Sequence, residues 1–104
     1  IYLEQLYLNI LIPVQFNVIF SSDGKKFLTC AEKDIGIFIE GNSKVNKIAT
    51  DDIVRSCCFG PDGEWFAIGL ENGIIQMCDL DGKCFNKIEV GSAVWSIKCI
   101  ECKE

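Results

Sequence analysis

The chain has 104 residues, and its 10 Lys and Arg against 15 Asp and Glu give a net charge of −5. Arg55 is its single arginine and no basic cluster is present, which argues against nucleic-acid binding, because phosphate affinity comes from clustered Lys and Arg. Histidine is absent, which removes the commonest general base and metal ligand. We therefore expect no enzyme activity, no cofactor and no small-molecule substrate.

The opening segment, residues 1–13, is apolar. It has no positive n-region and no small-residue cleavage site, so it makes a poor signal peptide. It is also shorter than the roughly 20 apolar residues that a membrane-spanning helix needs, so we expect no direct membrane insertion. One interpretation of this segment is the last strand of a preceding repeat unit.

Residues 14–50 have the pattern of four short strands joined by tight turns. Asp23-Gly24 and Gly41-Asn42 are typical turn pairs, because Gly adopts positive φ without strain and Asp bonds to the nearby backbone. No stretch shows the 3.6-residue period of a helix. The expected strands cover residues 16–20, 27–31, 35–39 and 44–49.

Residues 51–91 repeat this pattern. Turns are expected at Pro61-Asp62-Gly63, Asn72-Gly73 and Asp81-Gly82. The Asn-Gly pair predicts a type I′ hairpin turn, in which both central residues have positive φ. The expected strands cover residues 54–59, 65–70, 74–78 and 84–90. A third unit, residues 92–104, is expected to begin with a strand at Val94.

The two units are copies of one another. Phe20-Ser-Ser-Asp-Gly-Lys-Lys-Phe27 aligns with Phe59-Gly-Pro-Asp-Gly-Glu-Trp-Phe66 at a shift of 39 residues, and Val54 recurs as Val94 at a shift of 40. A period of about 40 residues is the length of one propeller blade. Apolar residues in succession, such as Ile74-Ile75, suit strands that are covered on both faces.

These residues resemble a WD40 repeat, whose first strand ends in Phe-Ser-Pro-Asp-Gly and whose third strand reads Ile-x-Ile-Trp-Asp. The second unit has Phe59-Gly-Pro-Asp-Gly63 and places Cys78-Asp79 where the family has Trp-Asp, while Phe38 holds the Trp place in the first unit. The resemblance covers about residues 14 to 100. It implies an all-β fold, a WD40-type β-propeller segment with about two four-stranded antiparallel blades plus the first strand of a third.

A narrower set of residues is similar to a family of propeller subunits of intraflagellar transport complex A. The matching stretches, in the family's order, are Asp34-Ile-Gly-Ile-Phe38, Glu71-Asn-Gly-Ile-Ile75, residues 81–89 and Val94-Trp-Ser-Ile97. This resemblance implies a non-enzymatic protein–protein interaction scaffold in retrograde ciliary transport and cilium assembly. Its partners would be other subunits of a multiprotein complex, in the cytoplasm and in the cilium at the basal body and axoneme. A WD40 scaffold of another trafficking or coat-like complex is the alternative.

Three side chains are candidate partner contacts: Trp65, Trp95 and Arg55. Trp65 aligns with Lys26 at the 39-residue shift, and a position that holds Lys in one unit is expected to be exposed. Exposed Trp is enriched at protein interfaces. Trp95 aligns with Arg55 at a shift of 40 and is expected near a propeller face. Semi-buried packing within the blades is the alternative for both tryptophans.

The seven cysteines are odd in number and lack the spacing of a disulfide framework, so we expect thiols in a reducing compartment. Cys57 and Cys58 are adjacent in one strand and should face opposite sides of it. Cys99 aligns with Phe59 and is expected in the core. The alternative function is a thiolate metal-binding module, although its spacings differ from those of paired zinc knuckles. Its ligands would be Cys78, Cys84, Cys99 and Cys102.

Two blades leave open faces, because a repeat unit buries its faces against its neighbours. On this argument four aromatic side chains should be exposed to solvent in the isolated chain. They are Phe20, Phe38, Phe59 and Phe66.

Overall fold

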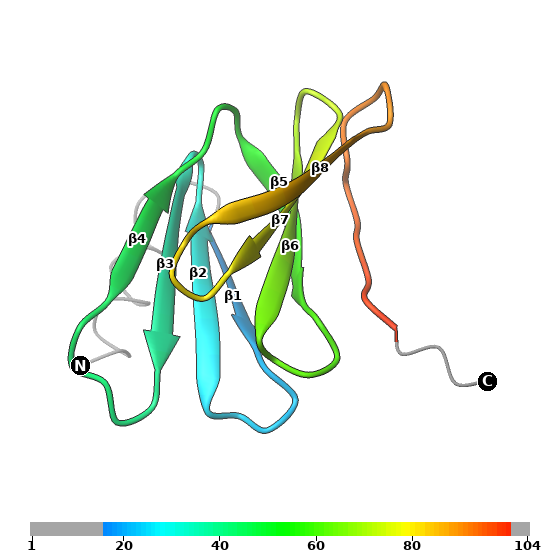
Figure 1. The fold of residues 1–104 in the computed structure, drawn as a ribbon. Helices are drawn as coiled ribbons and strands as arrows, with labels where there is room; N and C mark the ends of the chain where they lie inside the picture. Colours follow the sequence, from blue (N-terminus) through cyan, green and yellow to red (C-terminus); the bar gives the residue numbers. More distant parts are fainter. Residues whose placement is uncertain (1–15, 101–104) are drawn as a thin grey trace.

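The computed structural model describes residues 16–100, and its regular structure consists of eight β-strands. They form two four-stranded antiparallel sheets, in the orders β1-β2-β3-β4 and β5-β6-β7-β8 (Figure 1). The strands are β1 (Phe16–Phe20), β2 (Lys26–Ala31), β3 (Asp34–Ile39), β4 (Asn46–Ala49), β5 (Val54–Phe59), β6 (Trp65–Leu70), β7 (Ile74–Asp79) and β8 (Cys84–Glu89). The predicted all-β fold with two four-stranded antiparallel units is confirmed. The opening segment, residues 1–13, lies outside the described residues.

The strand expected to begin at Val94 is not formed in the described part of the chain. Residues 90–100 have no regular structure, although the Val94 N–H donates to the Leu70 carbonyl oxygen at 3.2 Å. A strand needs a partner whose backbone groups match its own along several residues. Within residues 16–100 no strand pairs with this segment beyond that one bond.

Glycine turns separate the strands, as predicted, but the type of one turn differs from the prediction. In each of four turns the N–H of a glycine with positive φ donates to the carbonyl oxygen three residues earlier, at 2.9–3.1 Å. Of the Asn72-Gly73 pair only Gly73 has positive φ, so the type I′ prediction is wrong. Three residues separate β6 from β7, the next commonest length of a hairpin loop, and the Asn72 Oδ1 accepts the Ile74 N–H within it at 3.1 Å. The four glycines are Gly24, Gly63, Gly73 and Gly82.

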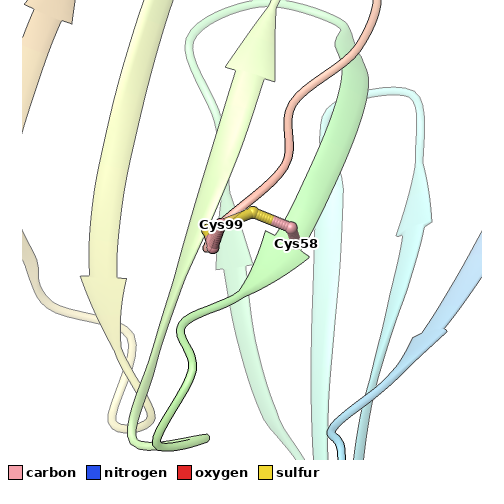
Figure 2. The surroundings of a disulfide bond; sticks show 2 residues. All are labelled: Cys58 and Cys99. Carbon is pink, nitrogen blue, oxygen red and sulfur yellow. A yellow bond between two sulfur atoms is a disulfide. The ribbon is translucent and has the colours of Figure 1, made fainter. Parts of the chain in front are cut away.

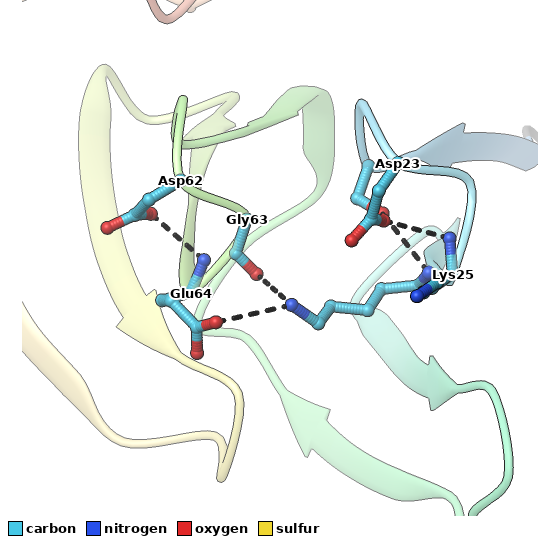
Figure 3. Close-up of polar contacts among 7 residues, drawn as sticks. Asp23, Lys25, Asp62, Gly63 and Glu64 are labelled. Carbon is cyan, nitrogen blue, oxygen red and sulfur yellow. Dashed lines mark hydrogen bonds and ion pairs between the residues drawn. The ribbon is translucent and has the colours of Figure 1, made fainter.

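The first turns of the two sheets lie side by side (Figure 3). Asp23 Oδ1 accepts the Ser21 hydroxyl at 2.6 Å and the Lys25 N–H at 2.9 Å, and these bonds hold the pKa of Asp23 below its usual value. Lys26 reaches from the first sheet to the second, where its Nζ donates to the Gly63 carbonyl oxygen at 3.1 Å. This aspartate therefore shapes a turn, and the lysine links the two sheets.

The core lies between the sheets and around β6, where every residue but the first is buried. Phe66 is 0 % exposed and Phe59 only 9 %, and Phe38 is half-buried, so their predicted exposure is wrong. Each sheet covers one face of the other, so these three aromatic side chains are less exposed than two open blades would leave them. Phe20, at 62 % exposed, follows the prediction. The fully buried large side chains are Phe66, Leu28, Ile35, Ile37, Ile68, Leu70 and Cys78.

Candidate functional site

Arg55 and Trp95 meet at one end of the second sheet. The pairing of β5 with β6 shifts register between Val54 and Ser56, and a bulge of this kind changes the direction of the side chain that it carries. The Arg55 guanidinium carbon lies 4.9 Å from the centre of the Trp95 ring. The Arg55 Nε also forms an ion pair with the Glu71 carboxylate. We call these three residues, Arg55, Glu71 and Trp95, the arginine–tryptophan site.

Trp95 is presented to solvent by a chain segment that is fixed at Val94. The Ser56 hydroxyl donates to the Val94 carbonyl oxygen at 2.9 Å, beside the Val94 bond to Leu70. Gly69 leaves room for this approach, because a Cβ built on it would lie 2.7 Å from the Val94 Cβ. Val94 is 8 % exposed whereas Trp95 is 65 % exposed. The anchored valine thus holds its neighbour's ring outside the core.

A disulfide fixes the same segment further along the chain. Cys58 on β5 is bonded to Cys99, and their Cα atoms are 6.3 Å apart (Figure 2). The expectation that the cysteines are all thiols is therefore wrong. Cys99 is half-buried, so the expectation that it is a core residue is also wrong. Successive side chains on β5 point to opposite faces, so Cys58 faces residues 90–100, which carry Cys99. Cys57 faces Cys30 of the first sheet, and the Cys57 and Cys30 sulfur atoms are 2.8 Å apart. The predicted opposite orientation of the adjacent cysteines is confirmed.

Trp65 lies apart from the arginine–tryptophan site. It is half-buried, as is Lys26, so the predicted exposure of this position is wrong in both units. The Trp65 ring packs so closely on Gly60 that a Cβ there would lie 2.7 Å from ring atom Cδ2. Its edge meets Phe85, with ring centres 6.4 Å apart and planes at 80°. These contacts match the alternative of packing within the blade.

The four cysteines of the metal-binding alternative are not gathered. Cys99 is bonded to Cys58, and Cys102 lies outside the described residues. Cys78 is buried, and burial together with a hydrogen bond to Cys84 raises the pKa of its thiol, which disfavours the thiolate that binds metals. Within residues 16–100 no three Cys, Asp or Glu side chains are arranged to hold a metal ion. The same residues include no helix long and apolar enough to cross a bilayer.

The interactions within the arginine–tryptophan site add little to the stability of the fold. A cation–π pair at an exposed site contributes about 0.5–1 kcal/mol, and a surface ion pair contributes about 0–1 kcal/mol. Together they orient Trp95 and leave most of its ring open to solvent. A large ring whose position is already set loses little conformational entropy on binding. Trp and Arg are also the residues that dominate binding energy at protein interfaces.

Comparison with known proteins agrees with this fold. Residues 20–104 match the family model of the anaphase-promoting complex subunit 4 WD40 domain. The intraflagellar transport protein 122 homolog of Mus musculus is 30 % identical over 73 residues, which are 66 % of this chain and 6 % of that protein. The chain therefore spans a small part of this relative's length. With its two four-stranded antiparallel sheets and a family match over most of its residues, the chain belongs to the WD40 family of β-propeller repeat proteins.

Proposed function

We propose that this chain is part of a non-enzymatic scaffold subunit of the intraflagellar transport complex A type, acting in retrograde ciliary transport and cilium assembly. WD40 membership and the partial match to an intraflagellar transport protein support a protein-interaction scaffold. Residues 34–38, 71–75 and 94–97 are similar to the complex A subunit family and occur in the same order along the chain, which supports the ciliary assignment. The protein would then work in the cytoplasm and the cilium, at the basal body and along the axoneme.

The exposure of the Trp95 ring is the observation that supports the arginine–tryptophan site as the partner contact. Its ring is held against Arg55, at 65 % exposure, and the positive charge of Arg55 is balanced by Glu71. A neutral site of this kind suits a partner that covers the ring with apolar or aromatic side chains. Trp65 would contribute a second, weaker contact, because its ring is half-buried and offers a partner less surface than Trp95 does.

Replacing Trp95 by alanine in the full-length protein is expected to lower its affinity for the other complex subunits at least about thirtyfold, because a Trp hot spot contributes about 2 kcal/mol or more. The measurement is affinity purification from ciliated cells, with quantitative mass spectrometry of the complex A subunits. Arg55→Ala is expected to have a smaller effect in the same direction, because the ring remains but loses its support.

Phe20→Ala is the matched control, since Phe20 is an aromatic residue of similar exposure, 62 %, at the far end of a first strand in the other sheet. Equal recovery of subunits with Trp95→Ala and Phe20→Ala would contradict the assignment of the contact. Recovery of no complex A subunit with the unaltered protein would contradict the ciliary assignment.

A scaffold of a different multisubunit complex is the second candidate. It is supported by the family model that matches the chain, which is named for a subunit of the anaphase-promoting complex. The same purification distinguishes the two, because subunits of another complex would be recovered in place of those of complex A and would show the same dependence on Trp95.

A further inference from the structure

Two buried cysteines meet across the interface between the sheets. Cys30 is on β2 of the first sheet and Cys57 is on β5 of the second, and they are 3 % and 7 % exposed. Their sulfur atoms are 2.8 Å apart. The sulfur atoms of a disulfide are about 2.05 Å apart, so a small movement of the side chains would bring these two within bonding distance.

Nothing in the scaffold function described above requires a thiol at either position. Both residues belong to the apolar core cluster, where an alanine or a valine would also fill space. The hydrogen bond between Cys57 and Cys30, and then burial, raise the pKa of the Cys57 thiol, so Cys57 is a protonated thiol at neutral pH. On the opposite side of β5, Cys58 is already bonded to Cys99, so this chain accommodates disulfide chemistry at the neighbouring position.

We propose that Cys30 and Cys57 are an oxidation site at which a disulfide forms between the two sheets. The oxidant is a hydroperoxide, with hydrogen peroxide as the simplest member. One thiol is oxidised to a sulfenic acid as the peroxide O–O bond breaks and one water leaves. The second thiol displaces the hydroxyl from that sulfur, the S–S bond forms and a second water leaves. Two thiols and one hydrogen peroxide thus give one disulfide and two waters.

The consequence is a strand held covalently on both of its faces. Cys57 would link β5 to the first sheet, and Cys58 links it to the segment that carries Trp95 and Cys99. In the reduced form the sheets are joined by the chain between β4 and β5, by side-chain packing, and by hydrogen bonds such as Lys26 to Gly63 and the Val54 N–H to the Glu32 carbonyl oxygen. Oxidation would therefore fix the angle between two consecutive blades.

Peptide mapping tests this directly on the full-length protein. The protein is treated with hydrogen peroxide, its remaining thiols are alkylated, and it is digested with trypsin without reduction. Residues 27–33 then form a peptide whose only cysteine is Cys30, and residues 56–83 form a peptide that contains Cys57, Cys58 and Cys78. We expect most of the peptide 27–33 to be recovered in a species linked to 56–83. Cys84, an exposed free thiol, serves as the reference for the extent of oxidation.

Cys57→Ser should abolish the link, whereas Cys78→Ser, the matched control, should leave it intact. The experiment on the unaltered protein stands even if a variant fails to fold. The proposal is overturned if peptide 27–33 remains free once Cys84 is fully oxidised, or if Cys57→Ser leaves the link in place. It is also overturned if the link forms equally well in concentrated urea, because proximity in the folded protein would then not be its cause.

Discussion

Replacing Phe66 by alanine is expected to lower the free energy of unfolding by about 3–5 kcal/mol, the range for a large core side chain that leaves a cavity. Phe66 is 0 % exposed at the start of β6, where it pairs in register with Phe59 on one side and Cys78 on the other. Domains are stable by only about 5–15 kcal/mol, so a large fraction of the stability should be lost. Equilibrium urea unfolding of the full-length protein measures the change.

Phe85→Ala is the matched control for this experiment, since Phe85 lies on the exposed strand β8 and is 58 % exposed. It should lose no more than the edge contact with Trp65, which is about 0.5–1.5 kcal/mol. Equal losses from the two substitutions would show that the core does not lie where the structure places it.

Replacing Gly73 by alanine is expected to cost about 2–5 kcal/mol, from two sources. Gly73 has φ of +85°, a conformation that costs an L-residue about 1–2 kcal/mol. A Cβ there would also lie 2.8 Å from the Ser92 nitrogen and 2.9 Å from its oxygen. These are backbone atoms, which cannot turn aside as a side chain can, and overpacking typically costs about 1–3 kcal/mol.

Gly41→Ala separates the two sources, because Gly41 has a similar φ of +83° and nothing within 4 Å of the added Cβ. It should cost only the conformational part, about 1–2 kcal/mol. Thermal or urea unfolding of both variants gives the difference. If Gly41→Ala costs as much as Gly73→Ala, the close packing of the segment at Ser92 against the turn is not a feature of the protein in solution.

The strands were largely predictable because turn residues mark their ends at regular offsets. The bounds of β1, β5 and β6 agree with the predicted ranges to the residue, and each of these strands ends or begins beside a glycine turn. The turn type at Asn72-Gly73 was not predictable from the dipeptide. The turn there has three residues between β6 and β7 and only Gly73 has positive φ, and this geometry follows from the pairing of the two strands, which the dipeptide does not specify.

The arginine–tryptophan site was predictable in part. The 40-residue shift aligns Trp95 with Arg55, and residues at equivalent places in consecutive units come together when the units stack. The place of Glu71 beside Arg55 is harder to predict from the sequence. It follows from the register of β5 and β6, in which the neighbouring residues Leu70 and Val54 pair. The Cys58–Cys99 disulfide could not be predicted from the sequence. It depends on which face of β5 residues 90–100 cover, and the tertiary structure determines that face.

We propose that the protein contacts its partners through the arginine–tryptophan site. Hydrogen–deuterium exchange of the full-length protein, free and within its purified complex, tests it most directly. We expect assembly to slow exchange at residues 53–56 and 92–98, around Arg55 and Trp95, and to leave exchange in the turn at residues 21–25 unchanged. Slower exchange confined to that turn or to β8, with residues 92–98 unchanged, would contradict it.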